Sequence, residues 1–433
     1  MKSAVCLALS VFAFVLAVVP VAAAPARIFD AKLMATLDRI EEFSPSPDGK
    51  YVLYSLRTVD YAAGTASSSL WVADAETGGA RRLAISDGGA SDGRWSPDGT
   101  RIYFLSSRKD GRAQVFRTDL AGKNAEPVTD LPLGVEAYKP APDGKTLVVA
   151  MAVFPDCRSV ACTKKRLDEQ AESKASGKVY DRLFVRHWDT WSDGRQNHLF
   201  AVKIGSTAAP VPLMTGFDGD CPTKPFGGAD DFAISPDGKT VLFSAKWMGN
   251  DAPWKTDFDL WQTPIDGSAK PQNLTEANKA WDAAAVFSPD GKTVAYRAMR
   301  RPGFEADRFA VMLRDMKTGT IRPLAAAWDR SAADMAFSPD GKTLYVTAEE
   351  EGQIKLFAIA VATGRVRALT DQGSVGAFAV RPDGIFYARA DLKSPTEIYR
   401  IGLAGGRPVR LTHADDKALS GVKWADWERF RFK

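Results

Sequence analysis

The stretch Val286–Tyr296 reads Val-Phe-Ser-Pro-Asp-Gly-Lys-Thr-Val-Ala-Tyr and places a turn sequence between two apolar runs. Pro289 has the φ angle that the second position of a type I turn requires, and Gly291 adopts positive φ without steric cost. Ser288 and Asp290 can hydrogen-bond to nearby backbone groups, which also favours a tight turn. The stretch therefore predicts a β-hairpin with a short, bulged loop.

The tripeptide Pro-Asp-Gly occurs seven times in the 433-residue chain. Five of the six intervals between copies are 43 to 53 residues, and the interval from Pro142 to Pro236 is 94 residues. An interval of about 40–50 residues is typical of one four-stranded propeller blade. Each copy begins a repeat that contains further apolar stretches and ends in a pair such as Leu274-Thr275. We therefore predict an all-β fold, a seven-bladed β-propeller of four-stranded blades over residues 42–418.

Two segments lie outside this repeat. Residues 25–41 contain apolar side chains at roughly helical spacing, including Phe29, Leu33 and Leu37, and predict a short N-terminal helix that packs on the propeller. The long interval predicts an insertion in blade three, over about residues 156–197. Long insertions in repeat folds project from one face and often take part in binding.

Residues 1–24 have the pattern of a secretory signal peptide. Lys2 precedes an apolar run from Ala4 to Val19, and the small residues Ala22-Ala23-Ala24 follow. The apolar run is short for a membrane span, which needs about 20 residues. We expect an exported, periplasmic or secreted protein that is not an integral membrane protein.

The cysteines outside this leader are Cys157, Cys162 and Cys221. Export permits disulfides, and Cys157 and Cys162 form the natural pair within the insertion. Cys221 is then either free or the true partner of one of them. The spacing lacks a Cys-x-x-Cys pair with a flanking histidine, so we expect no metal site and no cofactor. The net charge of +4 is spread over short basic runs, and we expect no nucleic-acid partner.

The insertion becomes aromatic after a charged stretch, and its centre is Arg186-His187-Trp188-Asp189. Two interpretations of these residues remain open. The aromatic side chains can simply pack the insertion onto its blade. Alternatively, Arg186, His187, Trp188 and Asp189 bind a substrate or a neighbouring domain.

The chain contains one Gly-x-Ser-x-Gly match, Gly89–Gly93. In hydrolases this motif forms a strand-to-helix turn that exposes the serine. Here a propeller hairpin follows at Trp95–Gly99 instead of a helix, and every histidine lies downstream. We interpret the match as coincidental and assign no catalytic residue.

Several stretches resemble the propeller of prolyl oligopeptidase-family serine peptidases, in the branch of dipeptidyl-peptidase V and acylaminoacyl-peptidase. They are Val179–Gly194 with its Arg-His-Trp-Asp core, Ala245–Leu260, Ala280-Trp281-Asp282 before Phe287–Gly291, and Ala298–Arg308. The resemblance implies a propeller that restricts access to short peptides, cleaved from their N-terminal side. It also implies an α/β-hydrolase domain, in the same chain or supplied separately, that carries the Ser-Asp-His triad.

Residues 419–433 resemble the lead-in to that hydrolase domain, and no triad position has a match in this chain. We expect the hydrolase domain to be absent here, and the segment from Val422 onward to be weakly anchored. A free-standing periplasmic TolB-like binding propeller that acts through protein partners is the alternative. A propeller with its own active site, such as a lactonase, would need acidic metal ligands at the ring centre.

Overall fold

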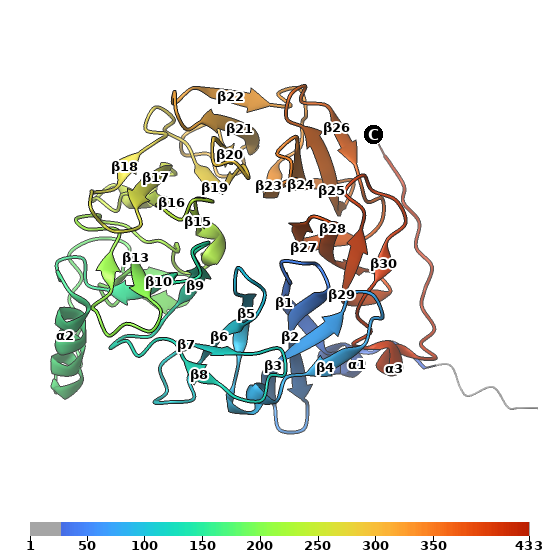
Figure 1. Ribbon diagram of the computed structural model, residues 1–433, viewed down its shortest axis with the longest axis horizontal. Helices are drawn as coiled ribbons and strands as arrows, with labels where there is room; N and C mark the ends of the chain where they lie inside the picture. Colours follow the sequence, from blue (N-terminus) through green and yellow to red (C-terminus); the bar gives the residue numbers. More distant parts are fainter. Residues whose placement is uncertain (1–26, 433) are drawn as a thin grey trace, which may run out of the picture.

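The computed structural model describes residues 27–432, so the predicted leader over residues 1–24 lies outside the described residues. Seven four-stranded antiparallel sheets follow one another around a ring, which confirms the seven-bladed β-propeller (Figure 1). Each Pro-Asp-Gly copy joins the first two strands of its blade. The long interval belongs to blade three, where the chain leaves the sheet between its second and third strands.

The seven blades follow one another in chain order. Blade one is β1 (Arg39–Pro45), β2 (Tyr51–Asp60), β3 (Thr65–Asp74) and β4 (Ala80–Arg82); blade two is β5 (Ser91–Trp95), β6 (Ile102–Ser106), β7 (Gln114–Thr118) and β8 (Glu126–Pro127). Blade three is β9 (Ala137–Pro140), β10 (Thr146–Val153), β13 (Gln196–Lys203) and β14 (Val211–Pro212); blade four is β15 (Phe232–Ile234), β16 (Thr240–Lys246), β17 (Phe258–Pro264) and β18 (Gln272–Asn273). Blade five is β19 (Asp282–Phe287), β20 (Thr293–Ala298), β21 (Ala310–Asp315) and β22 (Ile321–Leu324). Blade six is β23 (Ala332–Phe337), β24 (Thr343–Glu350), β25 (Gln353–Ala360) and β26 (Val366–Ala368); blade seven is β27 (Ser374–Arg381), β28 (Gly384–Asp391), β29 (Ser394–Ile401) and β30 (Val409–Arg410).

The turn between the first two strands is built by side chains as the sequence predicts. In blade five, the Ser288 hydroxyl donates to the Asp290 carboxylate at 2.7 Å and accepts from the Thr293 N–H at 3.0 Å. Gly291 has φ of 70°, in the left-handed region. The same serine–aspartate pair recurs in blades one, two, four and six. In blade three the serine position is Ala141, and the Asp143 carboxylate accepts the strand N–H groups directly.

An apolar cluster of buried residues lies at each of the seven junctions between neighbouring blades. The junction of blades four and five, for example, packs Leu242 and Leu260 against Val294 and Tyr296. Alternation along each strand produces these clusters, because every second side chain faces the neighbouring sheet. The core is therefore a ring of inter-blade layers.

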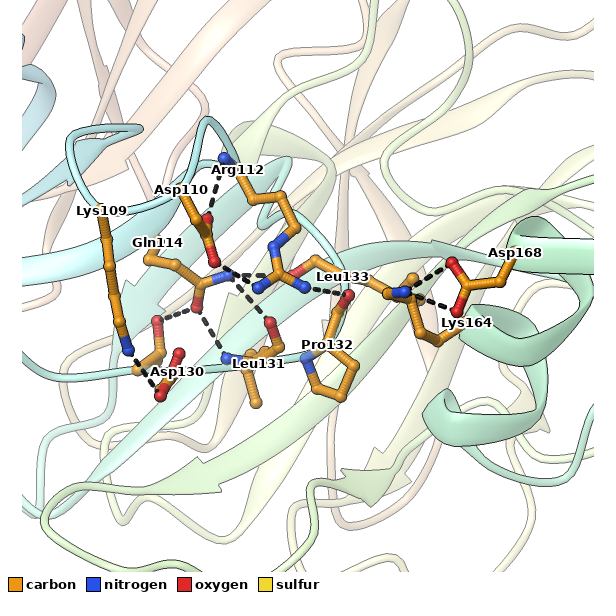
Figure 2. Close-up of polar contacts among 11 residues, drawn as sticks. Lys109, Asp110, Arg112, Gln114, Asp130, Leu131, Pro132, Leu133, Lys164 and Asp168 are labelled. Atoms are coloured by element: carbon orange, nitrogen blue, oxygen red, sulfur yellow. Dashed lines mark hydrogen bonds and ion pairs between the residues drawn. The ribbon is translucent and has the colours of Figure 1, made fainter. Parts of the chain in front are cut away.

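A buried amide fixes the connection from blade two to blade three (Figure 2). Gln114 is 2% exposed, and its Nε2 donates to the Leu131 and Leu133 carbonyl oxygens at 3.2 and 3.0 Å. Its Oε1 accepts from the Thr129 hydroxyl at 2.8 Å and the Leu131 N–H at 2.9 Å. All four hydrogen-bonding positions of the amide are thus used. On the same side, Arg112 donates to the Pro132 carbonyl oxygen at 2.7 Å.

The N-terminal helix α1 (Ala31–Thr36) is shorter than residues 25–41. It begins where the Asp30 carboxylate accepts the Leu33 N–H at 2.7 Å, a helix cap. It ends because Leu37 is extended and the Asp38 N–H bonds to Asp415, just before α3 (Asp416–Leu419). Among residues 27–432, no helix is long and apolar enough to cross a membrane.

The C-terminal segment is better anchored than the sequence indicates. Val422 forms a parallel bridge with Arg27, and the Trp424 ring lies 4.9 Å from the Phe29 ring. Beyond Trp424 the segment is exposed and runs along the outside of blade seven towards β26 (Figure 1). There Arg429 and Arg431 pair with Glu351 at the tip of the β24–β25 hairpin. The weak anchoring expected from Val422 onward is therefore wrong for Val422 and Trp424.

Candidate functional site

The elaborated loops gather on one face of the ring. Strands alternate in direction within each blade, so every connection between a second and a third strand emerges on the same face. This face carries the blade-three insertion, the blade-four loop between Lys246 and Phe258, and the blade-five loop between Ala298 and Ala310. It is the face with the most chain available for binding.

The insertion begins with helix α2 (Val160–Glu172), which projects outward at the edge of the ring (Figure 1). A disulfide joins Cys157 to Cys162 in the first turn of this helix, with Cα atoms 5.6 Å apart. Cys221 is a buried, free thiol. Within residues 27–432, no three side chains among His, Cys, Asp and Glu lie where they could hold a metal ion together.

The four predicted site residues form one small hairpin of β11 (Arg186–His187) and β12 (Thr190–Trp191). Trp188 and Asp189 make its turn, and Trp188 adopts φ of 52° with 75% of its surface exposed. Arg186 lies over the Trp191 ring at 5.7 Å. All four side chains are exposed, so the structure brings them together on the surface and leaves them free to contact another molecule.

An ion pair and aromatic contacts hold this hairpin to the ring. Arg182 pairs with Asp218 at 2.9 Å, and Asp218 also accepts from the Gln196 amide of β13 at 2.6 Å. The His187 ring stacks on Phe184 at 5.4 Å and meets the edge of Phe226 at 6.2 Å. The insertion therefore packs on its blade and exposes its tip, and binding by Arg186–Asp189 stays a prediction.

A continuous line of aromatic rings and cations leads from the hairpin across blades four and five. Lys246 lies 5.9 Å from the Phe184 ring and 5.1 Å from the Phe258 ring. Phe258 stacks on Trp281 at 4.7 Å, Trp281 meets Phe309 at 5.8 Å, and Arg297 lies 4.7 Å from Phe309. We call this line the aromatic arc. Its members are Phe226, His187, Phe184, Lys246, Phe258, Trp281, Phe309 and Arg297.

Lys246 supports the middle of the aromatic arc. Its Nζ donates to the Ala252 and Lys255 carbonyl oxygens at 2.9 and 3.0 Å, which closes the blade-four loop around the 3₁₀ turn η3 (Ala252–Trp254). Burial lowers the pKa of Lys246. Trp247 and Trp254 on this loop are 49% and 72% exposed, so the lysine holds an exposed apolar surface in place.

The inner end of the aromatic arc reaches a group of charges around the ring axis. Burial lowers the pKa of Arg297, and the acids Asp334 and Asp230 oppose that effect. Asp230 belongs to η2 (Ala229–Asp231), a short turn that lies on the inner side of the ring (Figure 1). Asp334 is exposed, and the desolvation that the surrounding protein imposes on its carboxyl raises the pKa of this group.

The same charged group continues into blades two and three. Burial lowers the pKa of Lys139 to about 8, and its Nζ donates to the Phe232 carbonyl oxygen at 2.6 Å. Arg94 pairs with Asp92 at 2.8 Å. The arc therefore joins an aromatic surface to a charged one, an arrangement able to hold both the apolar side chains and the charged ends of a peptide.

The sequence did not single out Lys246, Phe258, Trp281, Phe309 or Arg297 as site residues. Three of them lie within the stretches quoted for the family resemblance, and Arg297 and Phe309 directly flank one of these stretches, which was the available signal. Their convergence depends on the order of the blades around the ring. The Gly89–Gly93 match lies at β5, where Ser91 starts an inner strand and no helix follows.

Comparisons with known proteins find relatives over nearly the whole chain. The chain is 26% identical to dipeptidyl-peptidase 5 of Porphyromonas gingivalis over 90% of its length, and 28% identical to a probable dipeptidyl-peptidase 5 of Aspergillus clavatus over 96%. It spans 56% and 62% of the length of these two relatives. A family model described as lactonase, 7-bladed beta-propeller, matches residues 259–381.

Solved structures support the same fold. An acylaminoacyl peptidase of Pyrococcus horikoshii aligns with a TM-score of 0.70 at 15% identity, covering 94% of this chain and 57% of that protein. The β-propeller domain of the Trilobed protease from Pyrococcus furiosus, described as having an open velcro topology, aligns with a TM-score of 0.59 at 13% identity, covering 88% and 98% of the two chains. The resemblance of this chain to the propeller portion of dipeptidyl-peptidase and acylaminoacyl peptidase proteins is thereby confirmed.

Proposed function

We propose that this chain is the peptide-recognising propeller portion of an exported serine peptidase that acts on short peptides from their N-terminal side. The observation that carries this proposal is the aromatic arc, which leads from the exposed insertion to the charged ring axis. The similarity to dipeptidyl-peptidase 5 over nearly the whole chain supports it.

The chemistry of the arc suits an extended peptide. Aromatic faces bind apolar side chains, and exposed aromatic surface near polar groups is characteristic of binding sites. Trp188, Trp247 and Trp254 add exposed rings beside the arc. In this proposal the ring admits short or unfolded peptides and excludes folded proteins, with the insertion and the neighbouring loops on the face that a peptide approaches.

Catalysis in this proposal belongs to an α/β-hydrolase domain, in the same protein or in a partner. Among residues 27–432, the histidines occupy positions unlike that of a catalytic base beside a serine. His187 stacks on Phe184, and His413 bonds to Asp416 at 2.8 Å. His198 is buried, which lowers its pKa to about 4.

Export is the second part of the proposal. The pattern of residues 1–24 motivates it. The disulfide between Cys157 and Cys162 supports it, because structural disulfides persist in oxidising compartments. Fractionation of the source cells, followed by mass spectrometry of the mature N-terminus, tests this part. An intact Met1 in the cytosolic fraction would contradict export.

Peptide binding tests the recognition role. Short unblocked peptides with apolar side chains are titrated into the chain and followed by calorimetry. We expect His187→Ala and Phe258→Ala to weaken binding by roughly tenfold each, about 1.4 kcal/mol. Tyr61→Ala is the matched control, since Tyr61 is 54% exposed at the corresponding loop of blade one.

Equal affinity of the two arc variants and the parent chain would contradict the role of the arc. Absence of peptide binding, together with capture of one envelope protein at defined stoichiometry, would instead favour a free-standing binding propeller. In that case Trp188→Ala should leave the capture unchanged.

A further inference from the structure

The contact between blade one and blade seven, which we call the join, closes the ring. Each blade takes its four strands from one segment of the described chain, so no strand is exchanged across this join. It is held instead by side chains and by the segments that flank the propeller. Its apolar part packs Ile40, Val52 and Tyr54 of blade one against Phe386 and Ile398 of blade seven.

A buried carboxylate lies at one end of this join. Asp415 precedes helix α3 and is 3% exposed. Its Oδ1 accepts the Asp38 N–H, at the start of blade one, at 3.0 Å. Its Oδ2 is buried, and no donor within residues 27–432 bonds to it. A buried carboxylate oxygen without a donor is costly while the group is charged.

The charged groups around Asp415 do not neutralise it. Glu397 on β29 is fully buried and binds Arg410 at 2.7 Å, together with the Thr412 hydroxyl and the Ala414 N–H. The nearby cation Arg410, on β30, is shared between Glu397 and Asp416 at 2.7 and 2.6 Å.

Among the other groups on this side of the join, Arg27 donates to the Ala418 carbonyl oxygen of α3 at 2.6 Å, so its guanidinium is bonded to the backbone there. His413 bonds to Asp416, which leaves the Asp415 carboxylate without that ring. The Asp38 carboxyl, just before blade one, lies near Asp415. The Tyr54 hydroxyl of blade one lies near Glu397. The end of the join thus gathers four carboxyl groups, and Arg410 is bonded to Glu397 and Asp416 rather than to Asp415.

We infer that this join is a proton-linked latch, in which protonation of the Asp415 carboxyl tightens the contact between the first and last blades. A neutral carboxyl removes a buried charge from beside Asp38, Glu397 and Asp416. It also keeps an oxygen for the Asp38 N–H. The bond that connects the two blades therefore persists while the repulsion disappears.

The direction of the pH dependence follows from the raised pKa of the Asp415 carboxyl. Burial raises the pKa of Asp415 to about 6, and the Asp38, Glu397 and Asp416 charges act in the same direction. Burial likewise raises the pKa of Asp38. A carboxyl with a raised folded-state pKa stabilises the closed join fully below its ordinary value of 3.8, and this contribution is lost as pH rises through about 6.

Hydrogen exchange at pH 5.0 and 7.5, corrected for intrinsic rates, tests the latch in the full chain. Peptides covering residues 27–45 and 409–424 report on the two sides of the join. We expect about tenfold stronger protection at pH 5.0 than at pH 7.5 in the parent chain. Asp415→Asn should lose most of this difference, because an amide keeps the acceptor for Asp38 and cannot ionise, and only the smaller contribution of Asp38 is left.

Asp282→Asn is the matched control. Asp282 is a fully buried carboxyl at the start of β19, far from the join in chain order, and burial raises its pKa to about 7. This variant should keep the pH dependence at the join. Exchange at the join that is independent of pH in the parent, or pH dependence undiminished in Asp415→Asn, would overturn the inference. If Asp415→Asn does not fold, the parent measurement alone decides.

Discussion

Arg381 of the last blade donates hydrogen bonds to the Pro45 carbonyl oxygen of the first blade, with Nη2 at 2.7 Å. Its Nε also donates to the neighbouring Ser46 carbonyl oxygen at 3.0 Å. Arg381 occupies the place that serine takes in five of the other turn motifs. The seventh copy of the repeat thus exchanges a local turn-forming residue for one that connects the two ends of the ring.

Replacement of Arg381 by serine should open the join without unfolding the blade. The variant restores the usual turn residue but loses the bonds to Pro45 and Ser46, which we expect to cost about 2 kcal/mol. Thermal unfolding measures the total loss of stability, and hydrogen exchange in residues 39–50 shows whether this loss lies at the join. Arg314→Ser is the control, because Arg314 makes similar bonds to the Leu274 and Gly319 carbonyl oxygens away from the join. Equal exchange at the join in both variants would contradict this account.

Gln114 should be the polar core residue least tolerant of an apolar replacement among those described here. Gln114→Leu leaves the Leu131 N–H and two carbonyl oxygens buried without the amide, and we expect a loss of about 3 kcal/mol in the free energy of unfolding. Chemical denaturation measures it. Gln262→Leu, at a partly exposed amide on β17, serves as the control. A loss below that of the control would show that the network contributes little.

The turn aspartates should make the propeller sensitive to acid. In blade five the Ser288 hydroxyl is the main cause that lowers the pKa of Asp290, and Lys292 acts in the same direction. Because the folded-state pKa lies below the ordinary value, this stabilisation is present above about pH 4 and is lost as pH falls further. The parent chain should therefore lose stability as pH falls below about 4.

Ser288→Ala isolates this effect in one turn. It should cost about 1 kcal/mol at neutral pH, because one hydroxyl bond to Asp290 and one to the Thr293 N–H are lost. It should also make the acid slope shallower. Thermal unfolding from pH 3 to pH 7 tests both, with Ser176→Ala in the exposed insertion as control. An acid slope identical to that of the parent would exclude the hydroxyl as its cause.

Lys246 should control the order of the blade-four loop. Lys246→Met keeps much of the apolar stem but removes the bonds to the Ala252 and Lys255 carbonyl oxygens. We expect exchange in residues 247–257 to rise by roughly tenfold, the equivalent of one lost hydrogen bond. Lys279→Met is the control, since Lys279 reaches only Asp257 at 3.8 Å. Unchanged exchange in the loop would show that Lys246 does not hold it.

The local turn chemistry explains why the fold was predictable. Ser288, Pro289, Asp290 and Gly291 each favour the same turn independently of the rest of the chain, and seven copies at blade spacing leave little freedom in the architecture. The position of the insertion follows from the same spacing. The segment Arg186–Asp189 could be recognised because aromatic and charged residues are concentrated in it within a long insertion.

The remaining features depend on contacts that a linear pattern does not encode. Arg381 meets Pro45 across 336 residues, and Arg297 meets Phe309 only because β20 and β21 lie side by side. The anchoring of Trp424 on Phe29 joins the two ends of the described chain. The first and last of these pairs arise from the closure of the ring and the second from strand pairing within one blade, so the sequence could indicate the loops of the site but not which side chains meet.

Photo-crosslinking tests the central claim, peptide recognition by the aromatic arc, most directly. A short unblocked peptide carrying a photoreactive phenylalanine analogue is bound, irradiated, and its attachment points are mapped by mass spectrometry. We predict attachment within residues 180–191, 246–258 and 297–309, reduced by an excess of unlabelled peptide. Attachment spread over the blades without competition, or concentrated on the opposite face at turns such as Ser288–Gly291, would contradict the account.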